Sequence, residues 1–162
     1  MIRLILAFAI AFALNAPPAV AADIVTVHRL SDTLAGEAVL AVITACHSAT
    51  VVVVDSDGVQ QAALRGDTSS VFHLEAAYDK AYTAVTTRDD TSALLPRQKA
   101  GRLPPVMTRP LEHLMVAQGG IVVKVGDETV AAIGVSGSPN GGQGDEDCAR
   151  AGLDRIRDRL KT

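Results

Sequence analysis

Residues 50–58 read TVVVVDSDG, and this stretch decides the fold of the chain. Thr50 and the four valines after it are typical of a buried β-strand, because β-branched side chains pack well on a pleated surface. The Asp-Ser-Asp-Gly segment that follows favours a tight turn, since glycine adopts a positive φ without steric cost. Residues 59–65 are then predicted to return as the second strand of a β-hairpin.

A second hairpin is predicted towards the C-terminal end. Residues 121–125 (IVVKV) are predicted to form a strand with alternating burial, and residues 126–128 (Gly-Asp-Glu) supply a turn. Residues 129–135 form a nearly continuous apolar run, as expected for a strand that is buried on both faces. If this last strand pairs with the first one, Thr50 lies near Val135.

Segments with helical periodicity surround the two hairpins. Ser31 is the expected N-cap of a first helix, whose apolar side chains recur every three to four residues. Further helices are predicted over 66–87, 90–100 and 111–116, and Asp145 is expected to cap a last one. Paired hairpins between helices indicate an α/β protein of the α+β kind, in which helices pack on one antiparallel sheet.

Residues 1–21 have the pattern of a secretory signal. Arg3 provides a positive charge, residues 4–14 are apolar, and a proline pair precedes a small-x-small site that ends at Ala21. The apolar run is about half of the roughly 20 residues that a membrane span needs, so an uncleaved anchor is the less favoured alternative. We predict a domain over residues 22–162 without a membrane span, in the periplasm or secreted.

Length and charge limit the functions of this domain. Its 141 residues suffice for one domain with its own core. Loss of Arg3 with the signal takes the formal net charge from −3 to −4, so the domain has no overall electrostatic attraction to nucleic acid or to an anionic membrane. Tryptophan is absent and aromatic residues make up 3%, which disfavours base-stacking platforms.

Two cysteines, Cys46 and Cys148, are present in a chain that we expect to reach an oxidising compartment. Pairing of the first and last strands brings the end of the first helix to the start of the final helix. Because the two cysteines occupy these helix ends, we predict that they form a disulfide. Two buried free thiols are the alternative.

Several short segments, in the same order along the chain, carry a resemblance to a known family. They are Val53-Val54-Asp55-x-Asp57-Gly58, Arg65-x-Asp67, residues 79–84 (DKAYTA), Gly119-Gly120, residues 132–137 (AIGVSG) and Asp145-Glu146-x-Cys148-Ala149. On these segments the chain resembles the GlcG/HbpS family of small haem-binding proteins and the PduO C-terminal domain. Two positions depart from the usual pattern. Ile121-Val122 follows the glycine pair where the family commonly has x-Pro, and Gly66 stands where the family has Met.

The resemblance implies a single five-stranded antiparallel sheet flanked by helices. It also implies assembly into homo-oligomers and binding of haem in a groove that is often shared between subunits. A sensor or transport protein is a further partner that the resemblance suggests.

The first candidate haem contacts lie on the predicted helix over 66–87. His73 shares one helix face with Ala77, Lys80 and Ala84, at offsets of about one turn. Neutral imidazole is able to ligate iron, and the ammonium group of Lys80 is able to meet a propionate. The small alanines leave room for a flat ligand along this face. An exposed histidine beside a solvated lysine is the alternative.

A second set of candidates lies in the proline-rich segment over 88–110 and directly after it. His113 is a possible iron ligand, with Met107 and Met115 nearby. The basic side chains that we expect to hold the haem carboxylates are Arg97, Arg102 and Arg109. The alternatives are a histidine that faces water beside ordinary core residues and a solvated loop.

The sequence contains no phosphate-binding loop, dinucleotide fingerprint or Gly-x-Ser-x-Gly motif, so no catalytic residue is assigned. The predicted function is that of an exported haem-binding protein, which sequesters haem or presents it to a partner. Two alternatives stay open. One is an enzyme that degrades haem or acts on a small organic acid, and the other is a non-haem interaction module.

Overall fold

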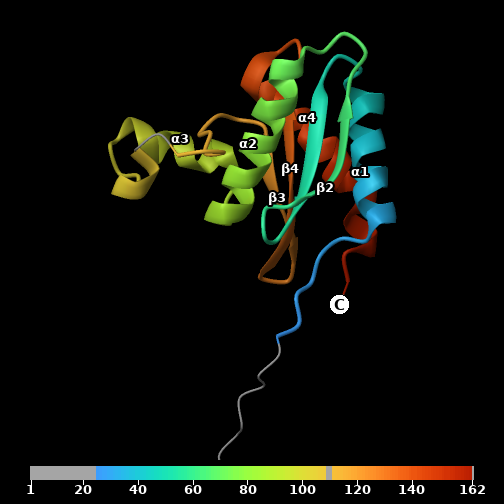
Figure 1. The fold of residues 1–162 in the computed structure, drawn as a ribbon, viewed down its shortest axis with the longest axis horizontal. Helices are drawn as coiled ribbons and strands as arrows, with labels where there is room; N and C mark the ends of the chain where they lie inside the picture. Colours follow the sequence, from blue (N-terminus) through green and yellow to red (C-terminus); the bar gives the residue numbers. More distant parts are fainter. Residues whose placement is uncertain (1–24, 109–110, 162) are drawn as a thin grey trace, which may run out of the picture.

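Four strands form one antiparallel sheet in the order β2-β1-β4-β3 in the computed structural model, which describes residues 25–108 and 111–161 (Figure 1). The strands are β1 (Thr50–Asp55), β2 (Gln60–Arg65), β3 (Gly120–Val125) and β4 (Glu128–Ser136). Both predicted hairpins are confirmed, and β1 pairs with β4 in the middle of the sheet, where Thr50 lies opposite Ser136.

Helices cover both faces of this sheet (Figure 1). They are α1 (Asp32–Ala45), α2 (Val71–Thr87), α3 (Thr91–Lys99) and α4 (Gly141–Ile156), with two 3₁₀ turns, η1 (Pro105–Thr108) and η2 (Arg157–Arg159). Successive side chains of a strand point to opposite faces, so the valines of β1 divide between two cores. Val51 and Val53 pack with α1 and α4, whereas Val52 and Val54 pack with α2.

The turn of the first hairpin depends on one carboxylate and one glycine. The backbone N–H groups of Asp57 and Val59 donate to Oδ1 of Asp55, at 3.0 and 2.9 Å. Gly58 has a φ of +81°, and a Cβ atom there would lie 2.7 Å from the ring of Tyr82. The turn therefore requires glycine, and it packs directly on α2.

The predicted disulfide between Cys46 and Cys148 is confirmed, with the two Cα atoms 6.1 Å apart. Cys46 follows α1, which begins after its N-cap Ser31, where Oγ accepts a hydrogen bond from the N–H of Leu34 at 3.2 Å. Cys148 lies within α4. The bond therefore joins the two helices that cover the same face of the sheet.

Three details differ from the predictions. Among the described residues the sheet has four strands, since the stretch over 25–31 is extended but largely exposed and pairs with no strand. The predicted helix over 111–116 is absent from the described part of that stretch, where a turn is formed instead. The last helix begins at Gly141 rather than at Asp145, because the glycine-rich stretch expected to be a loop already has helical geometry.

Residues 88–108 and 111–116 project beyond α2, away from the sheet (Figure 1). Within this segment, α3 carries Pro96 in its interior and ends in a turn at Gly101, whose φ is +63°. Two of the contacts between this segment and the body are made by threonine side chains. Thr91 exchanges hydrogen bonds with the backbone of Gly120, and the N–H of Met115 donates to Oγ1 of Thr83 at 2.7 Å.

The predicted signal over 1–21 lies outside the described residues. Within 25–108 and 111–161, no helix has the length and apolar character to cross a membrane.

Candidate functional site

The helix face that carries Lys80 is packed against the sheet. Ala77 and Ala84 are fully buried, and the side chain of Lys80 is only 5% exposed. A Cβ atom at Gly134 of β4 would lie 2.0 Å from the carbonyl oxygen of Ala77, so helix and strand are in backbone contact. The expectation of a slot for a flat ligand along this face is therefore wrong.

Lys80 has partners within the protein. Its Nζ lies 2.6 Å from Oδ2 of Asp145 and donates to the carbonyl oxygen of Val135 at 3.0 Å. The other oxygen of Asp145 accepts the N–H of Ser138 at 2.9 Å. Asp145 is therefore the buried counter-ion of Lys80 rather than a helix cap, and the ammonium group is not free to meet a propionate.

His73 lies at the first turn of α2, beside the end of β4. Its Nδ1 is 3.2 Å from Oγ of Ser136, and a Cβ atom at Gly137 would lie 2.9 Å from the imidazole ring. The ring is partly buried by these contacts. The structure thus places His73 against the sheet, and His73 does not line the groove described next.

A groove of about 610 Å³ lies between the C-terminal half of α2, α3, residues 104–107 and residues 111–114. This volume is typical of small-molecule sites, which are mostly apolar with a few polar groups. The side chains that line the groove are Tyr82, Thr86, Thr87, Leu94, Arg97, Pro104, Val106, Met107, Leu111, Glu112 and Leu114. It is therefore an apolar cleft with one cation, one carboxylate and one thioether.

His113 lies beside this groove. Its ring packs edge-on against Tyr78 with a centroid distance of 4.9 Å, and against the groove residue Tyr82 at 5.9 Å. Nδ1 of His113 is 3.0 Å from Oδ1 of Asp79, and Nε2 is 3.6 Å from Oε1 of the groove residue Glu112. The side chain is 44% exposed, so the imidazole is accessible from solvent.

The predicted basic residues are distributed along the same segment. Arg97 lines the groove and lies 3.7 Å from the carboxylate of Asp89. Arg102 is exposed just after α3, and Arg109 lies outside the described residues. Of the predicted site residues, the structure therefore places Arg97 in the groove and His113 beside it, and leaves His73 and Lys80 at the sheet. Met107, which the sequence analysis noted near His113, also lines the groove.

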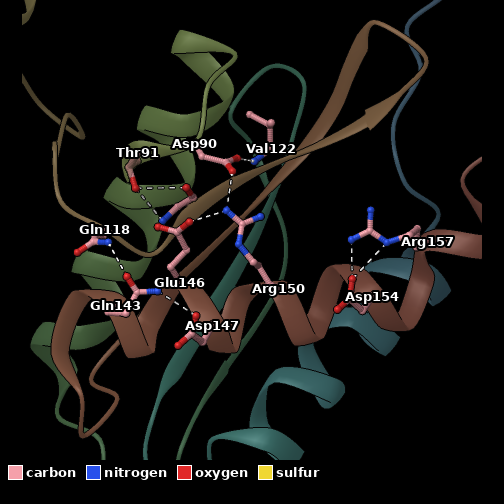
Figure 2. A network of polar contacts seen from close by, with 11 residues as sticks. Asp90, Thr91, Gln118, Val122, Gln143, Glu146, Asp147, Arg150, Asp154 and Arg157 are labelled. Atoms are coloured by element: carbon pink, nitrogen blue, oxygen red, sulfur yellow. Dashed lines mark hydrogen bonds and ion pairs between the residues drawn. The ribbon is translucent and has the colours of Figure 1, made fainter. Parts of the chain in front are cut away.

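A polar network that the sequence did not reveal fixes the start of α3 (Figure 2). The guanidinium of Arg150 binds the carboxylates of Asp90 and Glu146, and Asp90 also accepts the N–H of Val122 at 2.9 Å. The hydrogen bond that Arg150 donates to Glu146 raises the pKa of Arg150, which stays charged. The four-residue spacing of Glu146 and Arg150 is a helical signal, but their link to Asp90 spans 60 residues of sequence.

Across the described residues, no group of three or more His, Cys, Asp or Glu side chains is placed to hold a metal ion. The arrangement around the groove is suited instead to an organic ligand that supplies apolar area. An anionic group of such a ligand would meet Arg97, and a metal atom in the ligand with an open coordination position would meet His113 or Met107.

This combination defines a small α+β domain with an apolar groove beside its second helix. The model of the family described as "Haem degrading protein HbpS-like" matches residues 30–154. The chain belongs to this HbpS-like family, and the resemblance seen in the sequence is confirmed. Comparison with curated protein sequences finds no match.

Solved structures agree with this assignment. The HbpS chain in its crystal structure has 33% sequence identity to this chain. The alignment covers 83% of this chain and 97% of HbpS, with a TM-score of 0.74. A double mutant of HbpS from Streptomyces reticuli is 31% identical, with 88% of this chain and 97% of that chain covered and a TM-score of 0.74. The complex of PduOC with haem is 20% identical, covers 79% and 95% of the two chains, and shares the fold with a TM-score of 0.70.

Proposed function

We propose that this protein binds haem in the groove between α2, α3, residues 104–107 and residues 111–114, and that it sequesters haem or presents it to a partner. The observation that supports this most is the position of His113 at the rim of an apolar groove of about 610 Å³ in an HbpS-like chain. A planar macrocycle with two carboxylates needs an apolar surface, a cation and an axial ligand, and this region offers all three.

The groove residues fit haem in their chemistry. Leu94, Val106 and Leu111 provide apolar surface, and Arg97 is positioned to bind a propionate. His113 and Met107 are the candidate axial ligands, since imidazole and thioether both bind haem iron. Bound haem supplies a redox-active iron centre, while the protein residues hold it, orient it and limit its contact with water.

Titration of the purified protein with hemin, followed by absorbance, tests the proposal. We expect a shifted Soret band that weakens in His113→Ala or Met107→Leu, depending on which residue is the ligand. His73→Ala is the control, since this histidine lies on α2, the helix that forms one wall of the groove, but contacts Ser136 rather than the groove. Absence of any spectral shift with the unmodified protein contradicts the proposal.

Degradation of haem is the second candidate function, favoured by the description of the family. Loss of the Soret band with formation of a ring-opened product, in the presence of a reductant and oxygen, would distinguish catalysis from storage. A stable Soret band under these conditions would show that the protein binds haem without degrading it. A partner that is captured equally well by haem-free protein would instead favour the interaction module.

Export to the periplasm or the medium is part of the same proposal. It is supported by the signal pattern over 1–21 and by the disulfide between Cys46 and Cys148, a bond typical of oxidising compartments. Intact-mass measurement of the protein recovered from the producing cells should give a chain that begins at Ala22. Light scattering on that material would report whether it forms the expected homo-oligomer.

A further inference from the structure

His113 has an unusual backbone conformation. Its φ is +63°, a value that few residues other than glycine adopt. Contacts of the side chain hold the residue in place. The ring lies edge-on to Tyr78 at an interplanar angle of 90°, and Nδ1 lies 3.0 Å from the carboxylate of Asp79. Asp79 and Tyr78 are neighbours on α2, so a rigid helix fixes the orientation of this imidazole.

The contact with Asp79 also determines which ring nitrogen of neutral His113 carries the proton. An ionised carboxylate only accepts hydrogen bonds, so a neutral imidazole that pairs with it must be protonated at Nδ1. Nε2 is then the nitrogen with a free lone pair. It lies on the other side of the ring, 3.6 Å from Oε1 of Glu112, a residue that is 88% exposed and lines the groove.

We infer that Asp79 is a positioning residue that fixes His113 with Nε2 available as the axial ligand of haem iron. The inference rests on the proposed function, since it requires haem in the groove. A carboxylate behind a ligating histidine orients the ring and increases its basicity, and loss of such a partner typically lowers metal affinity about 10–100-fold. The negative charge of Asp79 also favours ferric over ferrous iron.

The chain offers a matched control for this pair. Nδ1 of His28 lies 2.9 Å from Oε2 of Glu128, in the same kind of contact, but at the end of the β3–β4 hairpin and outside the groove over residues 82–114. Its side chain is 54% exposed, close to the 44% of His113. Glu128→Gln therefore removes an equivalent carboxylate without altering the proposed site.

The first measurement uses the protein without haem. Nitrogen-15 NMR of the histidine rings at one pH above their titration range should show His113 as the Nδ1–H tautomer in the unmodified protein. We expect a mixture of tautomers in Asp79→Ala and no change at His113 in Glu128→Gln. A predominantly Nε2–H tautomer of His113 in the unmodified protein would overturn the inference, whatever the result with haem.

The second measurement uses hemin titration and spectroelectrochemistry. Asp79→Asn should bind hemin about 10–100-fold more weakly than the unmodified protein and raise the midpoint potential of the bound iron. In the background of His113→Ala, the same change should have no further effect on affinity. Equal affinity and equal potential in Asp79→Asn would overturn the inference while leaving haem binding intact, whereas failure of the unmodified protein to bind hemin would remove both.

Discussion

The two faces of the sheet are packed in different ways. The face under α1 and α4 is filled by large aliphatic side chains, with Ile121, Ile133 and Ile156 fully buried, and it carries the disulfide. The face under α2 is lined mainly by alanine and valine, and there the helix backbone touches Gly134 of β4. The first face is stabilised by buried volume and a covalent bond, and the second by close approach and one buried ion pair. They should therefore respond to different kinds of substitution.

Gly134→Ala should have the largest effect. Its Cβ atom would lie 2.0 Å from the carbonyl oxygen of Ala77 and 2.6 Å from the backbone nitrogen of Ala81, both of which are backbone atoms of α2. The helix must shift away from the sheet, and we expect a loss of unfolding free energy above about 4 kcal/mol, measured by urea denaturation.

Gly36→Ala in α1 is the control for this change, because nothing lies within 4 Å of a Cβ atom there. Alanine is a better helix former than glycine, so this variant should be neutral or up to about 1 kcal/mol more stable. Equal stabilities of the two variants would contradict the close approach of α2 to the sheet.

Lys80→Met should cause the second-largest loss of unfolding free energy. It leaves the carboxylate of Asp145, which is 6% exposed, without its cation, and breaking a buried pair in this way costs about 3–5 kcal/mol. The double variant Lys80→Met/Asp145→Asn should recover much of this loss, because the amide is neutral and still accepts the N–H of Ser138. Denaturation of the single and double variants would check this, and a double variant as unstable as the single one would contradict it.

On the opposite face of the sheet, the disulfide should contribute somewhat less to the free energy of unfolding than the Lys80–Asp145 pair does. Joint replacement of Cys46 and Cys148 by alanine opens a loop of 102 residues, and loss of a native disulfide typically costs about 2–5 kcal/mol. The measurement is urea denaturation of this variant beside the oxidised protein. Addition of a reductant should destabilise the unmodified protein by the same amount and leave the variant unchanged.

The smallest expected effect on stability comes from the ionisation of Tyr78, on the outer side of α2. Burial, followed by the nearby charges of Tyr82, Asp79 and Asp55, raises the pKa of Tyr78 above its ordinary value. Tyr82→Phe leaves Tyr78 as the sole tyrosine, so the absorbance of tyrosinate reports on it directly.

We expect Tyr78 to ionise at a higher pH in the folded protein than in the denatured chain. Between these two pH values the unfolded chain binds fewer protons, so the stability of the protein falls as the pH rises above about 10. Coincident titration curves for folded and denatured protein would contradict the partly buried position of the Tyr78 hydroxyl.

The sheet was predictable because its signals are local. The valine run, the Asp55–Gly58 turn and the second hairpin each lie within a few residues, and the alternation of burial follows from strand geometry. The disulfide could be predicted because the pairing of β1 with β4 brings the ends of α1 and α4 together. In contrast, residues 111–116 contain enough apolar side chains to suggest a helix, but the positive φ of His113 ends any helical run there.

The candidate site was only partly predictable. Helical periodicity shows that His73, Ala77 and Lys80 share a face, but it does not say whether that face meets a ligand or the sheet. Alanines that suggested room for a ligand are instead the means by which α2 approaches β4. The pair of His113 and Asp79 is separated by 34 residues, and no local pattern links the two.

The disulfide makes most of this protein a closed covalent ring. All four strands, α2, α3 and the groove lie on the chain between Cys46 and Cys148. A single cut by trypsin in the exposed basic stretch around Arg97 and Arg102 would consequently yield two fragments that migrate as one molecule until a thiol reagent is added. Damage to the walls of the groove therefore does not release either half of the sheet.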